Sequence, residues 1–441
     1  MLSNRTTTRR RMAAALVASA LAAPAAAVTA TASAISGATV TTASATATTS
    51  GDADLRPAAK ERLRARLEAV TEAGAIGAVG FSRGARGPAW DGAAGVRTID
   101  GAQRARAGDT ARVASVTKAM VATLAMQEVD RGRWTLDTTA GEVLPGLLPG
   151  HGDVTLEQLL SHRSGLPDHI SAILADVTDT DGLLRAIDRD RTDRQLVAAA
   201  LTQPWLFDPG TDFAYSNTNY VVVGLMLEKA TKRSMRALLE QRVFAPAGMT
   251  SARFPTTGPA FAGRRHLSDY AIFERPYNVD GHSSTIFSSA GAVVADASDI
   301  ASFYRALFAG RLVSTSSLDQ MLEPRTPAVG YGLGIYSAGD PCPGPDGQQQ
   351  LLYGHDGAAF GTVTFVFTSA DGGRQASVAF GGRQYVEQPP TLTAANDFLV
   401  DAFTATCPRT VPDTARERST RDLGTLSRNL DQAASEVLAG R

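Results

Sequence analysis

A serine followed three residues later by a lysine, in Ser115-Val116-Thr117-Lys118, is the first arrangement in this sequence that could do chemistry. At the first turn of a helix, residues three apart lie on one face, so the hydroxyl and the amine would be neighbours. A serine hydroxyl is a weak nucleophile until a neighbour takes its proton, and burial can lower the pKa of a lysine enough for its neutral amine to do so. The alternative is a helix N-cap followed by a solvated lysine. The chain has only four lysines among 43 basic residues, and an arginine at this position could not be deprotonated, so the context favours chemistry.

A second candidate is Tyr215-Ser216-Asn217, one hundred residues further along and directly before an apolar helical pattern. A phenol could relay a proton between the nucleophile, the lysine and a leaving group, and a carboxamide could hold a substrate amide. Taken alone, the tripeptide is explained more simply by a tyrosine that packs a loop and an asparagine that caps the next helix.

The third candidate is His355-Asp356-Gly357, which we place at the start of a strand. A glycine there would let another group approach the backbone closely, and an edge strand would offer unpaired N–H groups to a substrate. The alternative is a turn that the histidine and the aspartate cap.

Other catalytic and binding classes lack their motifs. The sequence contains no G-x-S-x-G, no H-E-x-x-H and no G-x-x-x-x-G-K-[ST]. Ser161 and His162 are adjacent, so their side chains would point apart on a helix, and we expect the histidine to fix a loop. We expect no metal site and no cofactor, because the two cysteines lie far apart and the histidines are scattered. A formal net charge of −1 argues against a nucleic-acid partner.

The N-terminus has the pattern of an export signal. Residues 1–34 contain a basic stretch at 9–11, an apolar stretch at 12–27 and the small-residue site Ala32-Ser33-Ala34. Residues 35–51 are almost all alanine, threonine, serine and glycine, which predicts a linker. We therefore expect a secreted protein with no stable membrane anchor. In an exported chain, Cys342 and Cys407 predict a disulfide that closes a loop of about 65 residues and stabilises the fold by about 4 kcal/mol.

The remaining pattern predicts sheet-forming segments at both ends of the chain and helices between them. We expect an α/β (α+β) fold, in which an antiparallel sheet flanked by helices comes from both ends and an all-α domain is inserted in the middle. The ranges are 52–153 and 285–410 for the sandwich domain, 154–284 for the helical domain and 411–441 for a charged tail that is loosely docked or removed. The apolar patterns predict helices at 55–73, 114–132 and 391–405 and a buried helix after Tyr220. They also predict a hairpin at 75–81 and 89–96, alternation from about 286 onward, and strands at 362–367 and 376–381.

In this order, S-x-x-K, Y-S-N and H-x-G resemble the serine penicillin-recognising family, which includes class C β-lactamases, D-alanyl-D-alanine carboxypeptidases and related esterases. The resemblance extends to V-T-L-E-Q-L-L-S-H-R-S-G-L-P (154–167), S-S-A-G-A-V-V-A-D-A-S-D-I (288–300) and Y-G-L-G-I (331–335). It covers roughly residues 55–408 and is strongest to the secreted carboxypeptidases of actinobacteria, which pair cysteines at similar positions. It implies a β-lactamase-like fold.

The resemblance also implies roles for single residues. Ser115 would be the nucleophile that forms an acyl-enzyme, and Lys118 and Tyr215 would move its proton. Asn217 would hold the amide of the acyl side chain. In the third motif, His355 would stand where many members have lysine, and Gly357 would let the strand pair with substrate. The backbone N–H groups of Ser115 and Ala358 would together form the oxyanion hole.

Three positions depart from the family pattern. Asp356 stands where a threonine or serine usually helps to bind a substrate carboxylate, Ala358 stands where carboxypeptidases often have threonine, and Tyr336 stands where an arginine is expected. Two like charges about 4 Å apart at a surface cleft repel by about 4 kcal/mol, so an ionised Asp356 would weaken binding of a carboxylate unless His355 is protonated.

These observations lead to one preferred hypothesis and three alternatives. We expect a monomeric, exported serine-type D-Ala-D-Ala carboxypeptidase that acts on peptidoglycan peptides and is acylated by β-lactams. The departures favour an esterase or D-amidase of the same fold, and a β-lactamase remains open. An inactive penicillin-binding module is disfavoured because Ser115, Lys118 and Tyr215 are all present.

Overall fold

The computed structural model describes residues 55–101, 103–261, 265–386 and 389–438, with the side chains of the last helix described as far as residue 425. The predicted signal peptide and linker lie outside these residues. A six-stranded antiparallel sheet has the order β2-β1-β10-β9-β8-β7. Its strands are β1 (Gly77–Arg83), β2 (Trp90–Gly95), β7 (Tyr336–Gly339), β8 (Leu351–Ala358), β9 (Thr362–Ser369) and β10 (Gln375–Gly381). Because β1 pairs with β10, the sheet joins both ends of the chain, as predicted.

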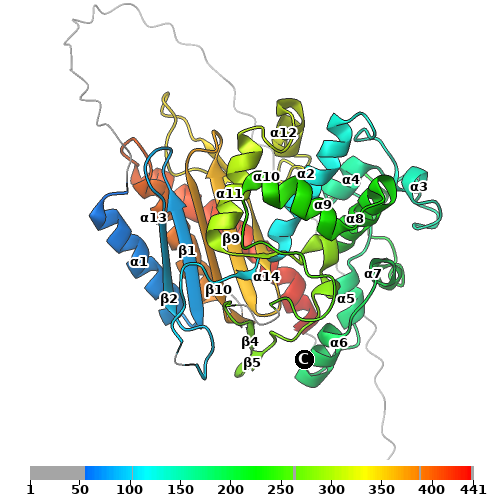
Figure 1. Cartoon of the computed structure of the whole chain (residues 1–441), viewed down its shortest axis with the longest axis horizontal. Helices are drawn as coiled ribbons and strands as arrows, with labels where there is room; N and C mark the ends of the chain where they lie inside the picture. Colours follow the sequence, from blue (N-terminus) through cyan, green and yellow to red (C-terminus); the bar gives the residue numbers. More distant parts are fainter. Residues whose placement is uncertain (1–54, 102, 262–264, 387–388, 439–441) are drawn as a thin grey trace, which may run out of the picture. The chain divides into compact units, whose positions relative to one another are not determined.

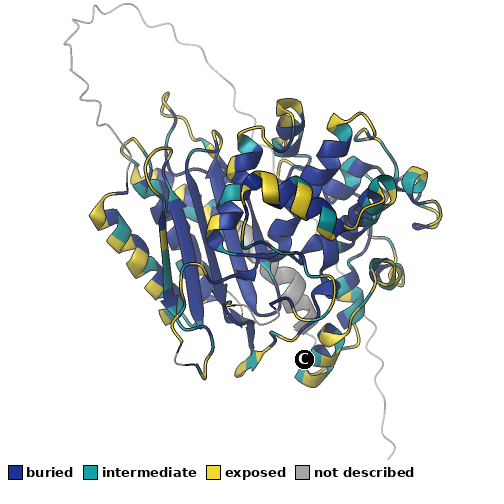
Figure 2. Cartoon of the chain, in the orientation of Figure 1, coloured by how far each residue is buried: buried dark blue, intermediate teal, exposed yellow. Residues whose placement is uncertain are grey.

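Helices cover both faces of this sheet. Helices α1 (Pro57–Glu72) and α13 (Pro390–Ala405) lie side by side on one face, where Leu63 and Phe398 share a core with Phe365 of β9. Helix α11 (Ala297–Phe308) packs on the other face. Every residue of β9 is buried, which agrees with a central strand covered on both sides (Figure 2).

The helical part of the chain follows α2 (Thr117–Asp130) and α3 (Ala140–Val143). Its members are α4 (Leu156–Leu160), α5 (His169–Leu174), α6 (Thr180–Asp188), α7 (Asp193–Ala200), α8 (Asn217–Thr231), α9 (Met235–Leu239) and α10 (Ala245–Ala247). Helix α8 is apolar on nearly all sides and shares one core with α2 and α11. This shared core joins the helical part of the chain to α2 and α11, which flank it in the sequence.

The structure departs from the predicted elements after residue 268. Two short strands, β4 (Tyr270–Ile272) and β5 (Pro276–Asn278), end the segment expected to be helical and join β11 (Arg383–Gln384) in a small sheet. Within residues 297–322, part of the region from about 286 onward where we expected alternation typical of strands, the helices α11 and α12 (Thr315–Leu322) form instead. Phe303 and Tyr304 of α11 are fully buried. The packing of these side chains explains the helix, whereas the alternating apolar and polar residues of the sequence had predicted strands.

The His355-Asp356-Gly357 motif lies at the end of its own strand, and its predicted place at a strand start was wrong. Strand β8 begins at Leu351, runs through the motif and turns before β9. Strand β7 pairs with β8 only as far as Tyr336 opposite Gly354. Residues 355–358 therefore pair with β9 alone, and no strand of the described residues pairs with their other edge.

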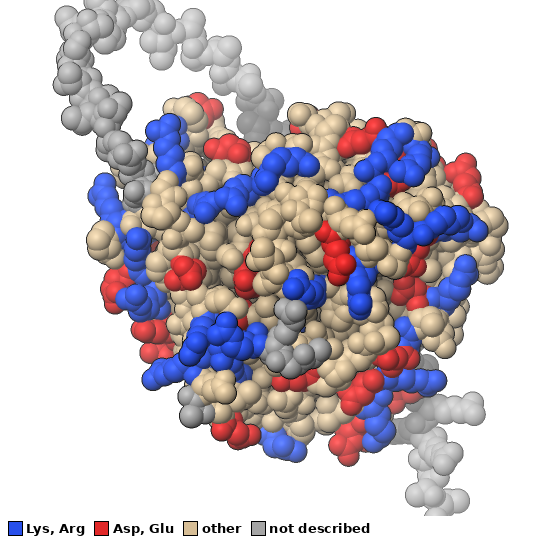
Figure 3. All heavy atoms as spheres, viewed as in Figure 1, with Lys and Arg blue, Asp and Glu red and all other residues tan. Residues whose placement is uncertain are grey.

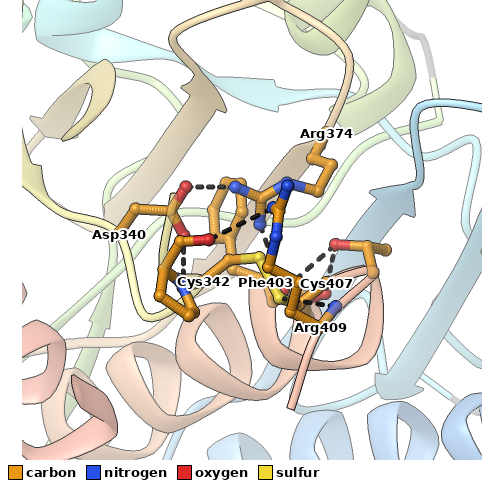
Figure 4. Close-up of a disulfide and its surroundings, with 9 residues drawn as sticks. Asp340, Cys342, Arg374, Phe403, Cys407 and Arg409 are labelled. Atoms are coloured by element: carbon orange, nitrogen blue, oxygen red, sulfur yellow. Dashed lines mark hydrogen bonds and ion pairs between the residues drawn. A yellow bond between two sulfur atoms is a disulfide. The ribbon is translucent and has the colours of Figure 1, made fainter. Parts of the chain in front are cut away.

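Cys342 and Cys407 form the predicted disulfide, with their Cα atoms 5.4 Å apart. It ties the loop after β7 to the end of α13 (Figure 4). Arg374 pairs with the buried Asp340 and donates to the Phe403 carbonyl beside it.

The C-terminal segment forms helix α14 (Asp413–Leu438), and its first turns are docked more firmly than we expected. Leu423 is 1% exposed and belongs to the core beneath α13. Asp422 accepts a hydrogen bond from Gly339 N of β7 at 3.1 Å, and Arg416 pairs with Asp401. Within the described residues, no helix has the length and apolar character needed to cross a membrane. Charges of both signs are interspersed over the face in Figure 3.

Candidate active site

Ser115 lies in a short 3-10 turn, Ala114–Val116, that leads directly into α2. Ala114 has a positive φ of 47°, an uncommon conformation for a residue with a Cβ atom, and such strained backbone is typical of functional turns. The Thr364 hydroxyl of β9 donates to the Arg112 carbonyl just before the turn. The serine, which is 8% exposed, is thereby held where the sheet meets the helical part of the chain.

Lys118 is completely buried and its amine points at Ser115. The Nζ atom lies 2.9 Å from Ser115 Oγ, 2.8 Å from Asn217 Oδ1 and 3.0 Å from the Ala290 carbonyl. Burial lowers the pKa of Lys118 to about 7, while the negative charges of Asp168 and Asp356 act in the opposite direction. Near neutral pH a large fraction of this lysine is therefore uncharged and able to accept the serine proton.

Tyr215 places its ring over the same amine, 4.8 Å from Nζ. Its hydroxyl is buried and makes no hydrogen bond to the described residues, although Ser115 is near enough to favour its ionisation. Burial has the larger effect and raises the pKa of Tyr215 well above its usual value. The phenol therefore stays protonated near neutrality, so Lys118 is the better base and Tyr215 the better proton donor.

His162 supports Tyr215 from behind, in agreement with the prediction that it fixes a loop. The two rings stack at 4.1 Å, and His162 Nδ1 accepts a hydrogen bond from Ser216 N at 3.1 Å. Burial lowers the pKa of His162 far below its usual value, so the ring is neutral.

Asn217 connects Lys118 to a carboxylate that the sequence reasoning missed. Asp168 Oδ2 accepts hydrogen bonds from the backbone N of Asn217 at 2.6 Å and from its Nδ2 at 2.8 Å. Asp168 follows directly after the stretch 154–167, which carries part of the family resemblance, and this adjacency was the available signal. The Ala290 carbonyl was missed as well, because residue type carries no information about a main-chain acceptor.

Gly357 lies against the nucleophile turn. A Cβ atom at this position would lie 2.3 Å from the Val113 carbonyl and 3.1 Å from Ser115 N, so only glycine lets β8 come this close. The group that the glycine admits is thus the protein's own turn, and the pairing of this strand with a substrate stays a prediction. Ser115 N and the end of β8 at Ala358 are consequently neighbours, an arrangement compatible with an oxyanion hole.

His355 and Asp356 are both buried at this end of β8. The His355 ring makes contacts through both nitrogens, Nδ1 with the Asp356 carbonyl at 2.5 Å and Nε2 with the Tyr331 hydroxyl at 3.3 Å. Asp356 Oδ1 lies 3.3 Å from His355 Nδ1 and makes no hydrogen bond to a described residue. Tyr336 packs edge-on against His355 at 5.0 Å, so an aromatic ring occupies the position where the family pattern has arginine.

The structure thus brings all three predicted motifs to one place, with Ser115, Tyr215 and Asn217 grouped around the Lys118 amine and the end of β8 alongside. A hollow of about 1020 Å³ beside the disulfide includes none of these residues in its walls. Among the described residues there is no cluster of side chains suited to hold a metal ion. A buried nucleophile, a base with a pKa near neutrality and neighbouring backbone donors together can carry out acyl transfer.

Comparisons with known proteins agree with this chemistry. The chain is 31% identical to a D-stereospecific amidohydrolase from a Streptomyces species, covering 77% of this chain and 98% of that one with a TM-score of 0.64. It is 28% identical to penicillin-binding protein 4 of Amycolatopsis lactamdurans, and that match covers 57% of this chain and 67% of the relative. It is 29% identical to penicillin-binding protein 4* of Bacillus subtilis (strain 168), and that match covers 43% of this chain and 44% of the relative. The chain spans about half the length of the Bacillus subtilis relatives that it matches.

The family model described as Beta-lactamase matches residues 60–380, which include every motif of the site. The fold predicted from the resemblance is confirmed by this match and by the amidohydrolase structure. The chain belongs to the Beta-lactamase family, a family of serine hydrolases with this fold.

Proposed function

We propose that the protein is an acyl-transferring hydrolase that forms a covalent acyl-enzyme on Ser115 and cleaves amides or esters whose leaving group has no carboxylate. The single observation that carries this proposal is the 2.9 Å contact between Ser115 Oγ and a buried lysine whose pKa is lowered to about 7. Such a pair has a nucleophile and its base already in hydrogen-bond contact.

The proposed reaction has two halves. Neutral Lys118 takes the Ser115 proton while Oγ bonds to the substrate carbonyl carbon, and the N–H groups of Ser115 and Ala358 stabilise the oxyanion. Tyr215 then donates its proton to the leaving amine or alcohol, whose bond to the carbonyl carbon breaks, and Lys118 returns the serine proton to Tyr215. In the second half, water attacks the acyl-serine and its proton goes to Lys118. The bond between Oγ and the carbonyl carbon then breaks, Lys118 gives the proton to Oγ, and the acid leaves as Ser115 is restored.

The charge around β8 supports the substrate class. A substrate carboxylate at this end of β8 would meet the Asp356 carboxylate, and the position expected to hold an arginine is occupied by Tyr336. Like charges in such a site would disfavour the carboxylate. The D-stereospecific amidohydrolase from Streptomyces, similar over nearly its full length, supports amides of D-amino acids as the first class to test.

The second candidate is the D-Ala-D-Ala carboxypeptidase that the motifs favour. The similarity to penicillin-binding protein 4 of Amycolatopsis lactamdurans supports it. In this case His355 would have to be protonated to offset Asp356, and β-lactams would acylate Ser115.

A direct experiment is mass spectrometry of the intact protein after incubation with benzylpenicillin, a D-Ala-D-Ala peptide, D-phenylalanine amide or 4-nitrophenyl acetate. We expect an adduct that maps to Ser115 and is absent in Ser115→Ala, with turnover of the amide or ester exceeding that of the peptide. Faster turnover of the peptide would favour the carboxypeptidase. No adduct and no turnover with any substrate would overturn the proposed function.

We also propose that the protein acts as a monomer outside the cell. The predicted signal at residues 1–34 and the Cys342–Cys407 disulfide support export, because disulfides persist in oxidising compartments. Detection of the enzyme in the culture medium as a species of monomer mass tests both points, and retention in the cytoplasm would contradict export.

A further inference from the structure

The segment around Asp168 is bound closely to the segment that carries Tyr215 and Asn217. The Pro167 carbonyl accepts hydrogen bonds from Ser216 Oγ at 3.2 Å and from Thr218 Oγ1 at 2.8 Å. His169 N donates to Thr218 Oγ1 at 2.9 Å. These contacts fix the half-buried Asp168 beside Asn217, although 49 residues separate the two in the sequence.

The Asp168 carboxylate determines how the Asn217 amide is oriented. Both hydrogen bonds from Asn217, at 2.6 and 2.8 Å, go to Asp168 Oδ2, which can only accept when ionised. The amide nitrogen must therefore face Asp168, and the amide oxygen faces Lys118 Nζ at 2.8 Å. With the amide reversed, its NH₂ group would point at the lysine and its oxygen at a carboxylate, two unfavourable contacts.

Asp168 also supplies negative charge to the lysine amine. The negative charges of Asp168 and Asp356 both interact with the Lys118 amine. They favour its charged ammonium form, whereas burial favours the neutral amine. Four further titratable side chains that act on or lie beside the amine carry no charge at neutral pH. The His162 and His169 rings have pKa values lowered by burial, and the Tyr215 and Tyr220 hydroxyls have pKa values raised by burial.

We propose that Asp168 is a positioning residue of the acyl-transfer site, holding Asn217 so that its amide oxygen faces Lys118 and keeping a negative charge beside that lysine. This inference rests on the proposed function of Ser115 and Lys118. Asp168 acts through Asn217 and makes no contact with the nucleophile. Its other oxygen accepts from Ile170 N at 2.7 Å and Ser171 N at 3.3 Å, so the same side chain caps α5.

The test must separate positioning from capping. Asp168→Asn removes the charge and adds an NH₂ group that competes with Asn217. Asp179→Asn is a matched control, because Asp179 caps α6 through Gly182 N and belongs to no part of the site. The measurement is kcat/KM for 4-nitrophenyl acetate from pH 5 to 9, with the Ser115→Ala rate subtracted and the Tm of each variant recorded.

For Asp168→Asn we expect the acidic limb of the profile to move to lower pH by about one unit, since loss of a neighbouring negative charge favours the neutral amine. We also expect the plateau to fall about tenfold or more, because Asn217 is no longer held. Asp179→Asn should keep the wild-type limb and plateau. Asp168→Glu should keep the limb and lose only plateau rate, and it serves as the charged variant if Asp168→Asn is unstable.

An unmoved limb in Asp168→Asn, with a Tm loss like that of Asp179→Asn, would show that Asp168 only caps a helix and would overturn the inference. A limb shifted equally in Asp168→Glu would also overturn it. A wild-type rate no higher than that of Ser115→Ala would instead overturn the proposed function itself, so the two failures are distinguishable.

Discussion

At the scale of single residues, the chemistry depends on which group near Ser115 can lose a proton near neutral pH. Two groups face the serine, Lys118 and Tyr215. Burial moves their pKa values in opposite directions, because it disfavours the charged form of each, the ammonium of the lysine and the phenolate of the tyrosine. The same environment thus produces a base and an acid side by side.

The first prediction follows from the sign of the lysine shift. Lys118 can accept a proton only when neutral, so kcat/KM should rise with pH through about 7 and level off above it. Lys118→Arg should lower kcat/KM by about a hundredfold or more, because a guanidinium stays charged. Lys229→Arg on the exposed part of α8 is the control and should change neither value. A flat pH profile, or an active Lys118→Arg enzyme, would contradict Lys118 as the base.

The second prediction concerns substrate choice. Asp356→Thr removes the carboxylate that would repel a substrate carboxylate at the end of β8. We expect kcat/KM for a D-Ala-D-Ala peptide to rise at least about tenfold, which corresponds to only part of the repulsion energy between two close like charges. The kcat/KM for the matching peptide amide should rise less. Steady-state kinetics on both substrates measures the ratio. If the ratio of peptide to amide stays unchanged, Asp356 does not select against carboxylates.

At the scale of elements, the site depends on how closely β8 approaches the nucleophile turn. The strand pairs with β9 from Leu352 to Ala358, and Gly357 is the point where its backbone approaches Val113 and Ser115. The register of β8 therefore decides where the Ser115 and Ala358 N–H groups lie relative to one another.

The third prediction tests this approach. Gly357→Ala would place a Cβ atom 2.3 Å from the Val113 carbonyl, which must move or push β8 away. We expect kcat/KM to fall about a hundredfold, because small displacements of reacting groups cost rate steeply. Stability should fall by about 1–3 kcal/mol. Gly281→Ala, where no atom lies within 4 Å of the new Cβ, should leave both values near those of the wild type. Retained activity in Gly357→Ala would mean that this contact does not set the site geometry.

At the scale of the whole molecule, one core runs through the helical part, α2 and α11, and another lies beneath α1, α13 and the first turns of α14. The C-terminal helix contacts α13, β7, β8 and also α5, so it reaches elements on both sides of the site. Its docking is therefore part of the folded structure that holds β8 in place.

The fourth prediction measures that docking. Leu423→Ala should destabilise the protein by about 2–5 kcal/mol, because it removes a side chain that is 1% exposed and leaves a cavity beneath α13. Leu206→Ala, at a leucine that is 55% exposed, is the matched control and should change the free energy of unfolding little. Urea unfolding of both variants gives the comparison. Equal effects would mean that α14 is not packed against the core in solution.

The sequence by itself determined the features that depend on neighbours along the chain. The spacing of Ser115 and Lys118 predicts their contact because one helical turn brings residues three apart together. The apolar patterns predicted α1, α8, α13 and the strands β1, β2, β9 and β10 within a few residues. The order of the three motifs indicated the family.

Tertiary structure alone decided the features that depend on contacts across the chain. Asn217 and the Ala290 carbonyl reach Lys118 over 99 and 172 residues, and Asp168 orients Asn217 from a third segment. The α11 and α12 helices replaced expected strands because burial outweighed local alternation, against the sheet for α11 and against α2 for α12. The pairing of β8 with β9 placed Gly357 against the nucleophile turn. Hydrogen bonds and burial of this kind carry no local signal, because each needs two segments that only the folded chain brings together.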